Sequence, residues 1–170
     1  MLTVSSSCFY QQPNKNTEVA SLNTDGAFYE HWKRASGAVV LRNENGDLVR
    51  CSAKWYGNCL DALACRDGLV LAQQVGVQRV WLKTDCQELL KLWSVGEKQR
   101  SSVVTIMKEI RELSSLFYGF KSSFISRTCN KVAHVVAKQV TSETQVGWWQ
   151  FAPDCVSALM AADCNSDIDQ

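Results

Sequence analysis

The chain has 170 residues, 46% hydrophobic residues, six Trp and a formal net charge of +1. This hydrophobic fraction excludes an intrinsically disordered polypeptide, and the length suits one domain with a substantial core. A protein that clamps nucleic acid non-specifically is usually more basic, so we expect any nucleic-acid contact to be modest, local or metal-mediated.

The chain carries no signal for export or for insertion into a membrane. No stretch approaches about 18 consecutive apolar residues, and the N-terminal residues lack the basic region and apolar run of a signal peptide. The eight Cys show no Cys-x-x-Cys spacing, so we expect reduced, mostly buried thiols instead of a metal or disulfide framework. These features predict a nuclear or cytoplasmic protein without a transmembrane segment.

Turn signals and hydrophobic periodicity predict the secondary structure. Three strands come first, over residues 19–27, 35–42 and 47–56. The Asn43-Glu44-Asn45-Gly46 sequence between the last two is a strong hairpin signal, because Asn-Gly tolerates positive φ. The period then becomes helical and ends at Gly76, a residue typical of helix ends. The remaining elements are a strand at 79–84, helices at 87–93 and 103–117, a strand at 120–126 and a helix at 130–140.

This order of elements predicts the fold class and the limits of the domain. A hairpin meander followed by strands that alternate with helices indicates an α/β fold, with a mixed five-stranded sheet and helices packed on it. We expect an irregular lead-in over residues 1–17 and one domain over 18–142. A C-terminal tail over 143–170 then contributes a short helix that packs on the domain.

Three acidic residues lie at the ends of the predicted elements. Asp25 follows the first strand, Asp61 lies in the first turn of the first helix, and Asp85 follows the fourth strand. Each has a local explanation, because Asp25-Gly26 is ordinary turn chemistry and the other two fit capping arrangements at helix starts. Taken together they indicate a site, since chemistry in an α/β sheet gathers at strand ends.

The first helix is expected to carry its acid toward the other two. Asp61 shares a helix face with Cys65, Gly68 and Ala72, and these small residues allow close approach to the sheet. Asp67 lies about 600° of helical turn further on and faces elsewhere. Carboxylates that share a site raise one another's pKa, which a hard cation such as Mg²⁺ or Mn²⁺ offsets. Two such ions can drive in-line hydrolysis of a phosphodiester.

Several motifs in order along the chain resemble the plant ribonuclease H-like superfamily, in its reverse transcriptase-like, retroelement-derived branch. The similar segments are LNTDGAF at 22–28, GAVVLR at 37–42, ALACRDGL at 62–69, KTDC at 83–86 and NKVAHVVA at 130–137. The similarity runs from about residue 19 to residue 163. It implies a ribonuclease H-like fold and endonucleolytic cleavage of the RNA strand of RNA–DNA hybrids by two Mg²⁺ (or Mn²⁺) ions.

The resemblance also implies roles for four residues. Asp25 and Asp85 match the metal ligands, Asp61 stands where the family has a catalytic Glu, and His134 stands where classical ribonucleases H have a fourth carboxylate. Asp61 is one methylene shorter than Glu, and such a misplacement can cost about 100-fold in rate. His134 could assist product release or proton transfer, or it could be a half-exposed helix residue hydrogen-bonded to a neighbour.

Two functions therefore stay open. One is a metal-dependent hybrid ribonuclease that binds its nucleic acid, an RNA–DNA hybrid or RNA, only weakly. The other is a catalytically inactive nucleic-acid-binding or protein-interaction module on the same fold. A third function, an enzyme that acts on a small molecule, is not supported, because the sequence contains no cofactor-binding motif. The surface Lys and Arg residues, with Lys121 and Arg127 among them, could supply a weak phosphate-contacting surface, but we expect an ordinary solvated surface. Trp148, Trp149 and Phe151 could stack bases, but we expect them to fill the core under the tail.

Overall fold

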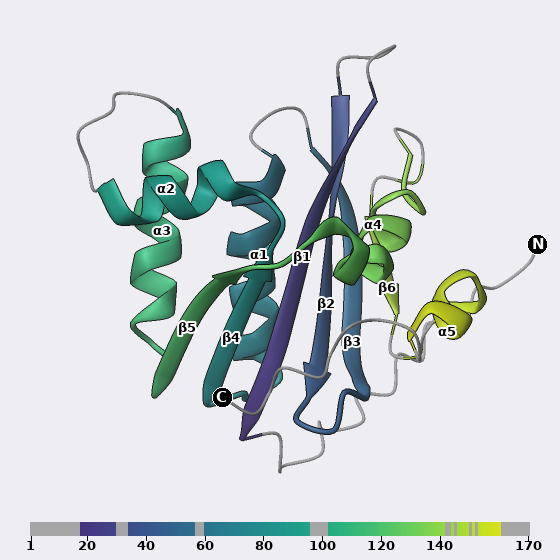
Figure 1. Ribbon diagram of the computed structural model, residues 1–170, viewed down its shortest axis with the longest axis horizontal. Helices are drawn as coiled ribbons and strands as arrows, with labels where there is room; N and C mark the ends of the chain where they lie inside the picture. The colour runs from purple at the N-terminus through teal and green to yellow at the C-terminus, as the bar shows by residue number, and fades with distance from the viewer. Residues whose placement is uncertain are drawn as a thin grey trace, which may run out of the picture.

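The computed structural model describes residues 18–29, 34–56, 60–95, 102–141, 144, 146–149, 151 and 153–160. A mixed six-stranded sheet in the order β5-β4-β1-β2-β3-β6 forms its centre (Figure 1). The strands are β1 (Val19–Tyr29), β2 (Arg34–Asn43), β3 (Leu48–Tyr56), β4 (Arg79–Thr84), β5 (Gly119–Phe124) and β6 (Val146–Trp149). The predicted α/β class and mixed sheet are confirmed.

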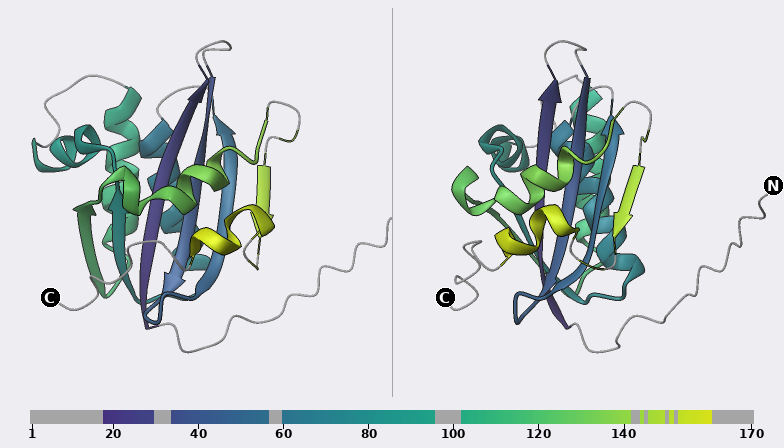
Figure 2. Two further views of the ribbon diagram at one scale, coloured as in Figure 1. Left: turned by 45° about the vertical axis from the view of Figure 1, so that its right-hand side comes forward. Right: turned by 90° about the vertical axis from the view of Figure 1, so that its right-hand side faces the viewer.

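Helices cover both faces of this sheet (Figure 2). The helices are α1 (Leu60–Gln74), α2 (Gln87–Val95), α3 (Ser102–Ser114), α4 (Lys131–Ala137) and α5 (Asp154–Met160), with a short 3₁₀ helix, η2 (Arg127–Cys129), before α4. One face carries α1, which contacts β1 and β2 and packs on α3. The other carries α4, which contacts β1, β2 and β3 and packs on α5.

The hairpin between β2 and β3 forms where its sequence predicts. Asn43 Oδ1 accepts hydrogen bonds from the backbone N–H of Asn45 at 3.0 Å and of Asp47 at 2.8 Å, and Gly46 takes φ +82°. The first and fourth strands are neighbours in the sheet. β1 and β4 pair in parallel from Val19 opposite Arg79 to Thr24 opposite Thr84.

The first strand is longer than its sequence predicts. We expect it to end at residue 27 with Asp25-Gly26 as a break, but β1 continues to Tyr29, with Asp25 opposite Ala38 and Gly26 opposite Gly37 of β2. Pairing with a distant strand here overrides local turn propensity. Asp25 therefore stays inside a strand, as the first β1 residue beyond the end of its pairing with β4.

The sheet has six strands instead of the five expected. β6 pairs antiparallel with β3, from Cys51 opposite Trp149 to Lys54 opposite Val146. The four residues of β6 show no alternation of polar and apolar side chains that would predict a strand. They form one because they pair with the edge of β3. The tail also differs in its aromatic residues. Phe151 is 83% exposed, whereas Trp149 packs against buried residues as expected; the Trp148 side chain lies outside the described residues.

Two hydrophobic clusters hold the layers together, one on each face of the sheet. Between the sheet and α1 and α3 lie Leu22, Leu41, Leu69, Leu82 and Ile110, among others. Between the sheet and α4 and α5 lie Val40, Val132, Val136 and Val156, among others. Fully burying one such side chain stabilises a protein by roughly 1.5–3 kcal/mol. The two clusters thus fix α1 and α4 independently on opposite faces.

The first helix ends as predicted. Gly76 has φ +78° and donates its N–H to Gln73 O, and Val77 donates to Ala72 O, which is the hydrogen-bond pair of a Schellman motif. Among the described residues no helix is long and apolar enough to cross a membrane.

The described Cys are free thiols, with Cys51 and Cys65 buried and Cys155 exposed. Residues 1–17, expected to form an irregular lead-in, lie outside the described residues.

We expect Gly37→Ala to destabilise the protein, because α1 passes close to β2 at this residue. A methyl group on Gly37 would lie 2.8 Å from Tyr56 Cε2 and 2.9 Å from Ala64 Cβ. Overpacking of this kind costs about 1–3 kcal/mol of unfolding free energy, measurable by urea titration. Gly119→Ala is the control, because its methyl meets only the flexible Arg79 side chain, 3.2 Å away at Cγ. Equal stability of the two variants would contradict this packing.

Candidate active site

Two of the predicted acids lie together where β4 ends. Asp25 is 5% exposed on β1, and Asp85 follows the last residue of β4. The Asn130 amide connects their surroundings. Its Nδ2 donates to Thr24 O at 2.9 Å and to Asp85 Oδ1 at 3.4 Å, and its Oδ1 accepts from Asn23 Nδ2 at 3.3 Å. One buried side chain therefore joins β1, the end of β4 and the start of α4.

Asn130 belongs to the candidate site, although its sequence context predicts no role for it there. It precedes α4 at the N-cap position, where Asn ordinarily accepts a hydrogen bond from the helix backbone, yet it makes no side-chain capping bond. Its amide is committed to β1 and Asp85 instead. The available signal was its place as the first residue of the NKVAHVVA segment at 130–137.

His134 contacts the Asp25 carboxylate from α4. The distance from His134 Nδ1 to Asp25 Oδ2 is 2.8 Å, and the His134 side chain is 49% exposed while that of Asp25 is 7% exposed. His134 is thus half-exposed and hydrogen-bonded to a neighbour, the local explanation considered for it. That neighbour is itself a candidate metal ligand, so the His also belongs to the site.

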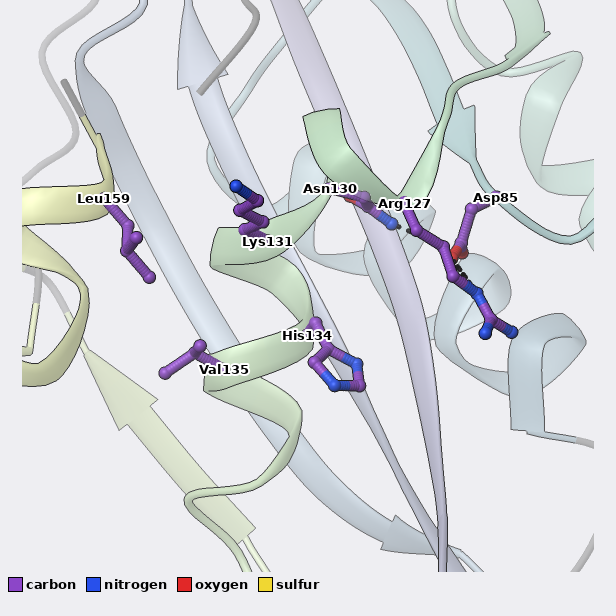
Figure 3. A pocket seen from close by; sticks show the side chains of 7 residues that line it. All are labelled: Asp85, Arg127, Asn130, Lys131, His134, Val135 and Leu159. Carbon is purple, nitrogen blue, oxygen red and sulfur yellow. Dashed lines mark hydrogen bonds and ion pairs between the residues drawn. The ribbon is translucent and has the colours of Figure 1, made fainter. Parts of the chain in front are cut away.

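Arg127 faces Asp85 from the 3₁₀ helix η2 (Figure 3). Arg127 Nε lies 3.4 Å from Asp85 Oδ2, in an ion pair between an Arg side chain that is 93% exposed and an Asp side chain that is 8% exposed. Arg127 is thus solvated, as expected, and it also contacts a candidate site residue. The end of β5 and the turn into α4 bring the two residues together.

The third acid reaches the same region from the opposite face of the sheet. Asp61 lies in the first turn of α1, where it hydrogen-bonds to the Cys86 thiol. The helix is held close to β1 by a contact of 3.1 Å between Cys65 Sγ and Thr24 Oγ1. Asp67 points elsewhere, as the helical angle predicts. Its carboxylate accepts a hydrogen bond from Tyr56 Oη at 2.7 Å.

The three acids interact through their charges. Burial, the negative charge of Asp85 and, to a smaller extent, that of Asp61 raise the pKa of Asp25, which lies at about 6. The hydrogen bond and charge of His134 lower the pKa of Asp25 and offset only part of this effect. Burial and the charge of Asp85 likewise raise the pKa of Asp61. The fold therefore gathers negative charge that its own residues balance incompletely.

The donor chemistry of this cluster suits a hard divalent cation, but its present arrangement does not hold one. Carboxylates that raise one another's pKa are the ligand type that Mg²⁺ and Mn²⁺ bind. Within the described ranges, however, no three His, Cys, Asp or Glu side chains are placed to ligate one ion. The Asp25 carboxylate is already hydrogen-bonded to His134. The Asp85 carboxylate accepts a hydrogen bond from Asn130 and forms an ion pair with Arg127. A bound cation would have to share or displace these partners.

A pocket of about 290 Å³ opens beside the acids (Figure 3). Its lining combines polar and charged groups with an apolar end formed by Val135 of α4 and Leu159 of α5. The complete lining is Asp85, Arg127, Asn130, Lys131, His134, Val135 and Leu159. Because Leu159 comes from the C-terminal tail, the tail contributes directly to the surface beside the site.

Solved structures with the same fold are ribonucleases H. A ribonuclease H1 from the halophilic archaeon Halobacterium salinarum NRC-1 superposes with a TM-score of 0.64 at 20% identity, over 71% of this chain and 96% of that one. The N-terminal ribonuclease H domain of a Mycobacterium tuberculosis protein gives 0.64 at 16% identity, over 71% and 91%. LC11-RNase H1, solved in complex with an RNA/DNA hybrid, gives 0.63 at 15% identity, over 73% and 97%. The fold is therefore ribonuclease H-like.

The family is shown by the sequence itself. The model of the reverse transcriptase-like family matches residues 23–140, well over half of the chain, and the chain belongs to that family. The match runs from two residues before Asp25 to the end of the α4 region, and so contains all four candidate site residues. A search of curated proteins gives no match.

We expect Asp25→Asn to stabilise the protein at neutral pH. The folded-state pKa of Asp25 is raised from 3.8 to about 6, so its protonated form favours folding below about pH 4. This contribution is lost as the pH rises through about 6. The variant should therefore be more stable by about 1–3 kcal/mol at pH 7 and nearly equal to the parent at pH 4. Urea unfolding across this pH range measures the difference.

Glu44→Gln in the exposed hairpin turn is the control for that experiment, because it removes a carboxylate away from the cluster. We expect its unfolding free energy to follow that of the parent at every pH. An Asp25→Asn variant that also follows the parent would show that the burial and the neighbouring charges do not disfavour the Asp25 carboxylate.

Proposed function

We propose that this protein is a metal-dependent endonuclease that cleaves the RNA strand of RNA–DNA hybrids. The observation that carries the proposal is the set of three electrostatically interacting acids, Asp25, Asp61 and Asp85, brought together from β1, α1 and the end of β4. Membership of the reverse transcriptase-like family and the ribonuclease H-like fold support it. A nuclear or cytoplasmic location, where such hybrids arise, suits this activity.

In this proposal Asp25, Asp61 and Asp85 would hold two Mg²⁺ or Mn²⁺ ions. When bound, such ions activate a water molecule and stabilise the charge that develops on the phosphate. The chain's own residues prepare the site. Asn130 fixes the Asp85 carboxylate against β1, and His134 hydrogen-bonds Asp25 and accepts or donates a proton at the solvent boundary. Arg127 and Lys131 line the adjoining pocket and supply positive charge for a phosphate.

A second function is favoured by specific observations. The Asp25 and Asp85 carboxylates already have internal partners, and Asp61 is shorter than the Glu that the resemblance implies at this position. A catalytically inactive module needs no cation there, because Arg127 and His134 partly balance the acids. In this alternative the domain binds nucleic acid weakly or contacts another protein.

The direct test is cleavage of an end-labelled RNA–DNA hybrid with Mg²⁺ and then with Mn²⁺. We expect internal cuts in the RNA strand alone, and we expect Asp85→Asn to reduce the rate at least 100-fold, because it removes a charged ligand that must be placed tightly. Glu112→Gln, an exposed acid on α3, is the matched control and should keep the parent rate. Absence of cleavage with both ions, in a folded protein, would favour the inactive module.

A repair experiment separates a weak enzyme from an inactive one. If reach alone limits Asp61, Asp61→Glu should raise Mg²⁺-dependent cleavage tenfold or more, because rate depends steeply on placement. Stability should change little, since both acids suit the first turn of a helix. Activity that appears only when His134→Asp is added would show that the fourth ligand is also limiting. If neither the single nor the double variant cleaves the hybrid, and both have normal circular dichroism spectra, the inactive binding module is the better explanation.

A further inference from the structure

The sheet face on the α4 side is covered over β1, β2 and β3, but no described helix packs on it over β4 and β5 (Figure 1, Figure 2). Val80 and Leu82 of β4 point into the core on the α1 side. Because side chains alternate along a strand, Arg79, Trp81 and Lys83 of β4 point to the other side. Arg79 is exposed there and Trp81 is partly exposed, whereas Lys83 is 3% exposed and therefore buried. Their partners in β5 are Gly119, Lys121 and Ser123.

Trp81 lies at the centre of this open area between two Lys side chains. The ammonium of Lys83 is 4.4 Å and that of Lys121 is 4.1 Å from the ring centroid. Trp81 Nε1 donates a hydrogen bond to Ser123 Oγ at 2.7 Å, which fixes the orientation of the ring. Lys121 is exposed and Trp81 is partly exposed. The ring is thus held in place and surrounded by positive charge.

A second cation–aromatic pair lies at the beginning of the same strands. The Arg79 guanidinium carbon is 5.1 Å from the ring centroid of Tyr118, and Tyr118 is 82% exposed. Residues 79 and 85 are six positions apart, which is about 20 Å along a strand. The pair around Arg79, the group around Trp81 and the Asp85–Arg127 ion pair therefore follow one another along β4 toward the acids.

The charge of these strands is of one sign. β4 (RVWLKT) and β5 (GFKSSF) contain three cationic residues and no acid, and two of the three, Arg79 and Lys121, are exposed. The whole chain has a net charge of only +1. A positive track with aromatic rings is typical of surfaces that bind single-stranded nucleic acid, where phosphates meet the cations and unstacked bases stack on the rings. A duplex keeps its bases stacked internally and presents none to such rings. The complementarity therefore favours a single strand.

We propose that the β4–β5 face, formed by Arg79, Trp81, Tyr118, Lys121 and Ser123, binds a single-stranded RNA segment. The strand extends from the hybrid whose RNA reaches Asp85, and in this respect the inference rests on the proposed function. The binding itself does not require cleavage. The face thereby selects hybrids with a single-stranded RNA overhang over blunt ones.

The experiment measures equilibrium binding by fluorescence anisotropy in EDTA, where cleavage cannot occur. The probes are a labelled single-stranded RNA of about ten nucleotides, within the range that single-strand sites occupy, a blunt RNA–DNA hybrid, and the same hybrid with an RNA overhang at either end. The variants are Trp81→Ala and Lys121→Ala. Phe151→Ala and Lys108→Ala are matched controls, because they remove an exposed aromatic ring and an exposed Lys elsewhere.

We expect Trp81→Ala to weaken binding of the single strand and of one overhang hybrid at least fivefold, which is the lower end of the effect of removing a stacking partner. Lys121→Ala should weaken both and reduce the salt dependence of binding by nearly one ion. Binding of the blunt hybrid should not change with either variant. Phe151→Ala and Lys108→Ala should bind all probes like the parent.

The outcomes separate this inference from the proposed function. Loss of overhang binding in a protein that cuts no hybrid would overturn the nuclease and keep the face. Cleavage with unchanged binding in both variants would overturn the face and keep the nuclease. If Trp81→Ala fails to fold, Trp81→Phe and Lys121→Ala carry the test, since an exposed Lys can be removed without loss of core. A change in sedimentation without a change in RNA binding would make the face a protein contact and overturn the inference.

Discussion

The arrangement of the candidate site depends on where the parallel pairing of β1 with β4 stops. The pairing ends at Thr24 opposite Thr84, so Asp25 and Asp85 are the first residues beyond it on the two strands. β1 continues past this point because β2 pairs with it as far as Tyr29. One strand that ends and one that continues leave room at the sheet for side chains from other elements, and Asn130, Arg127 and Asp61 enter there.

The cost of this arrangement is electrostatic. Burial disfavours the ionised forms of Asp25 and Asp61, and the negative charge of Asp85 raises the pKa of both. Three side chains partly offset this repulsion. His134 hydrogen-bonds to Asp25, Arg127 forms an ion pair with Asp85, and the Asn130 amide donates a hydrogen bond to Thr24 O. These partners do not cancel the repulsion completely, since Asp25 keeps a raised pKa despite His134. The negative charge that these partners leave unbalanced is the feature that the proposed metal-dependent function would use.

The two layers of helices make this convergence possible without contact between them. α1 packs on one face through Leu69 and Ala72, and α4 packs on the other through Val132 and Val136. Because each helix is fixed by its own hydrophobic cluster, their polar ends are set by packing and not by attraction between the site residues. The same division leaves β4 and β5 uncovered by described helices on the α4 side, next to the acids.

The sequence by itself determined the order of the elements, because periodicities of 2 and 3.6 residues and turn signals such as Asn43-Glu44-Asn45-Gly46 are local properties. It also indicated which acids belong together and that Asp67 does not, since a helical angle follows from spacing alone. Ordered motifs in addition predicted the family and the ribonuclease H-like fold.

Only the tertiary structure decided the sixth strand, the continuation of β1 through Asp25, and the partners of the acids. The Asn23–Asn130 hydrogen bond joins residues 107 positions apart, and the contacts of Arg127 with Asp85 and of Lys121 with Trp81 are likewise long-range. No local pattern specifies such pairs, because they form only after strand pairing and helix packing have set the distances between distant parts of the chain.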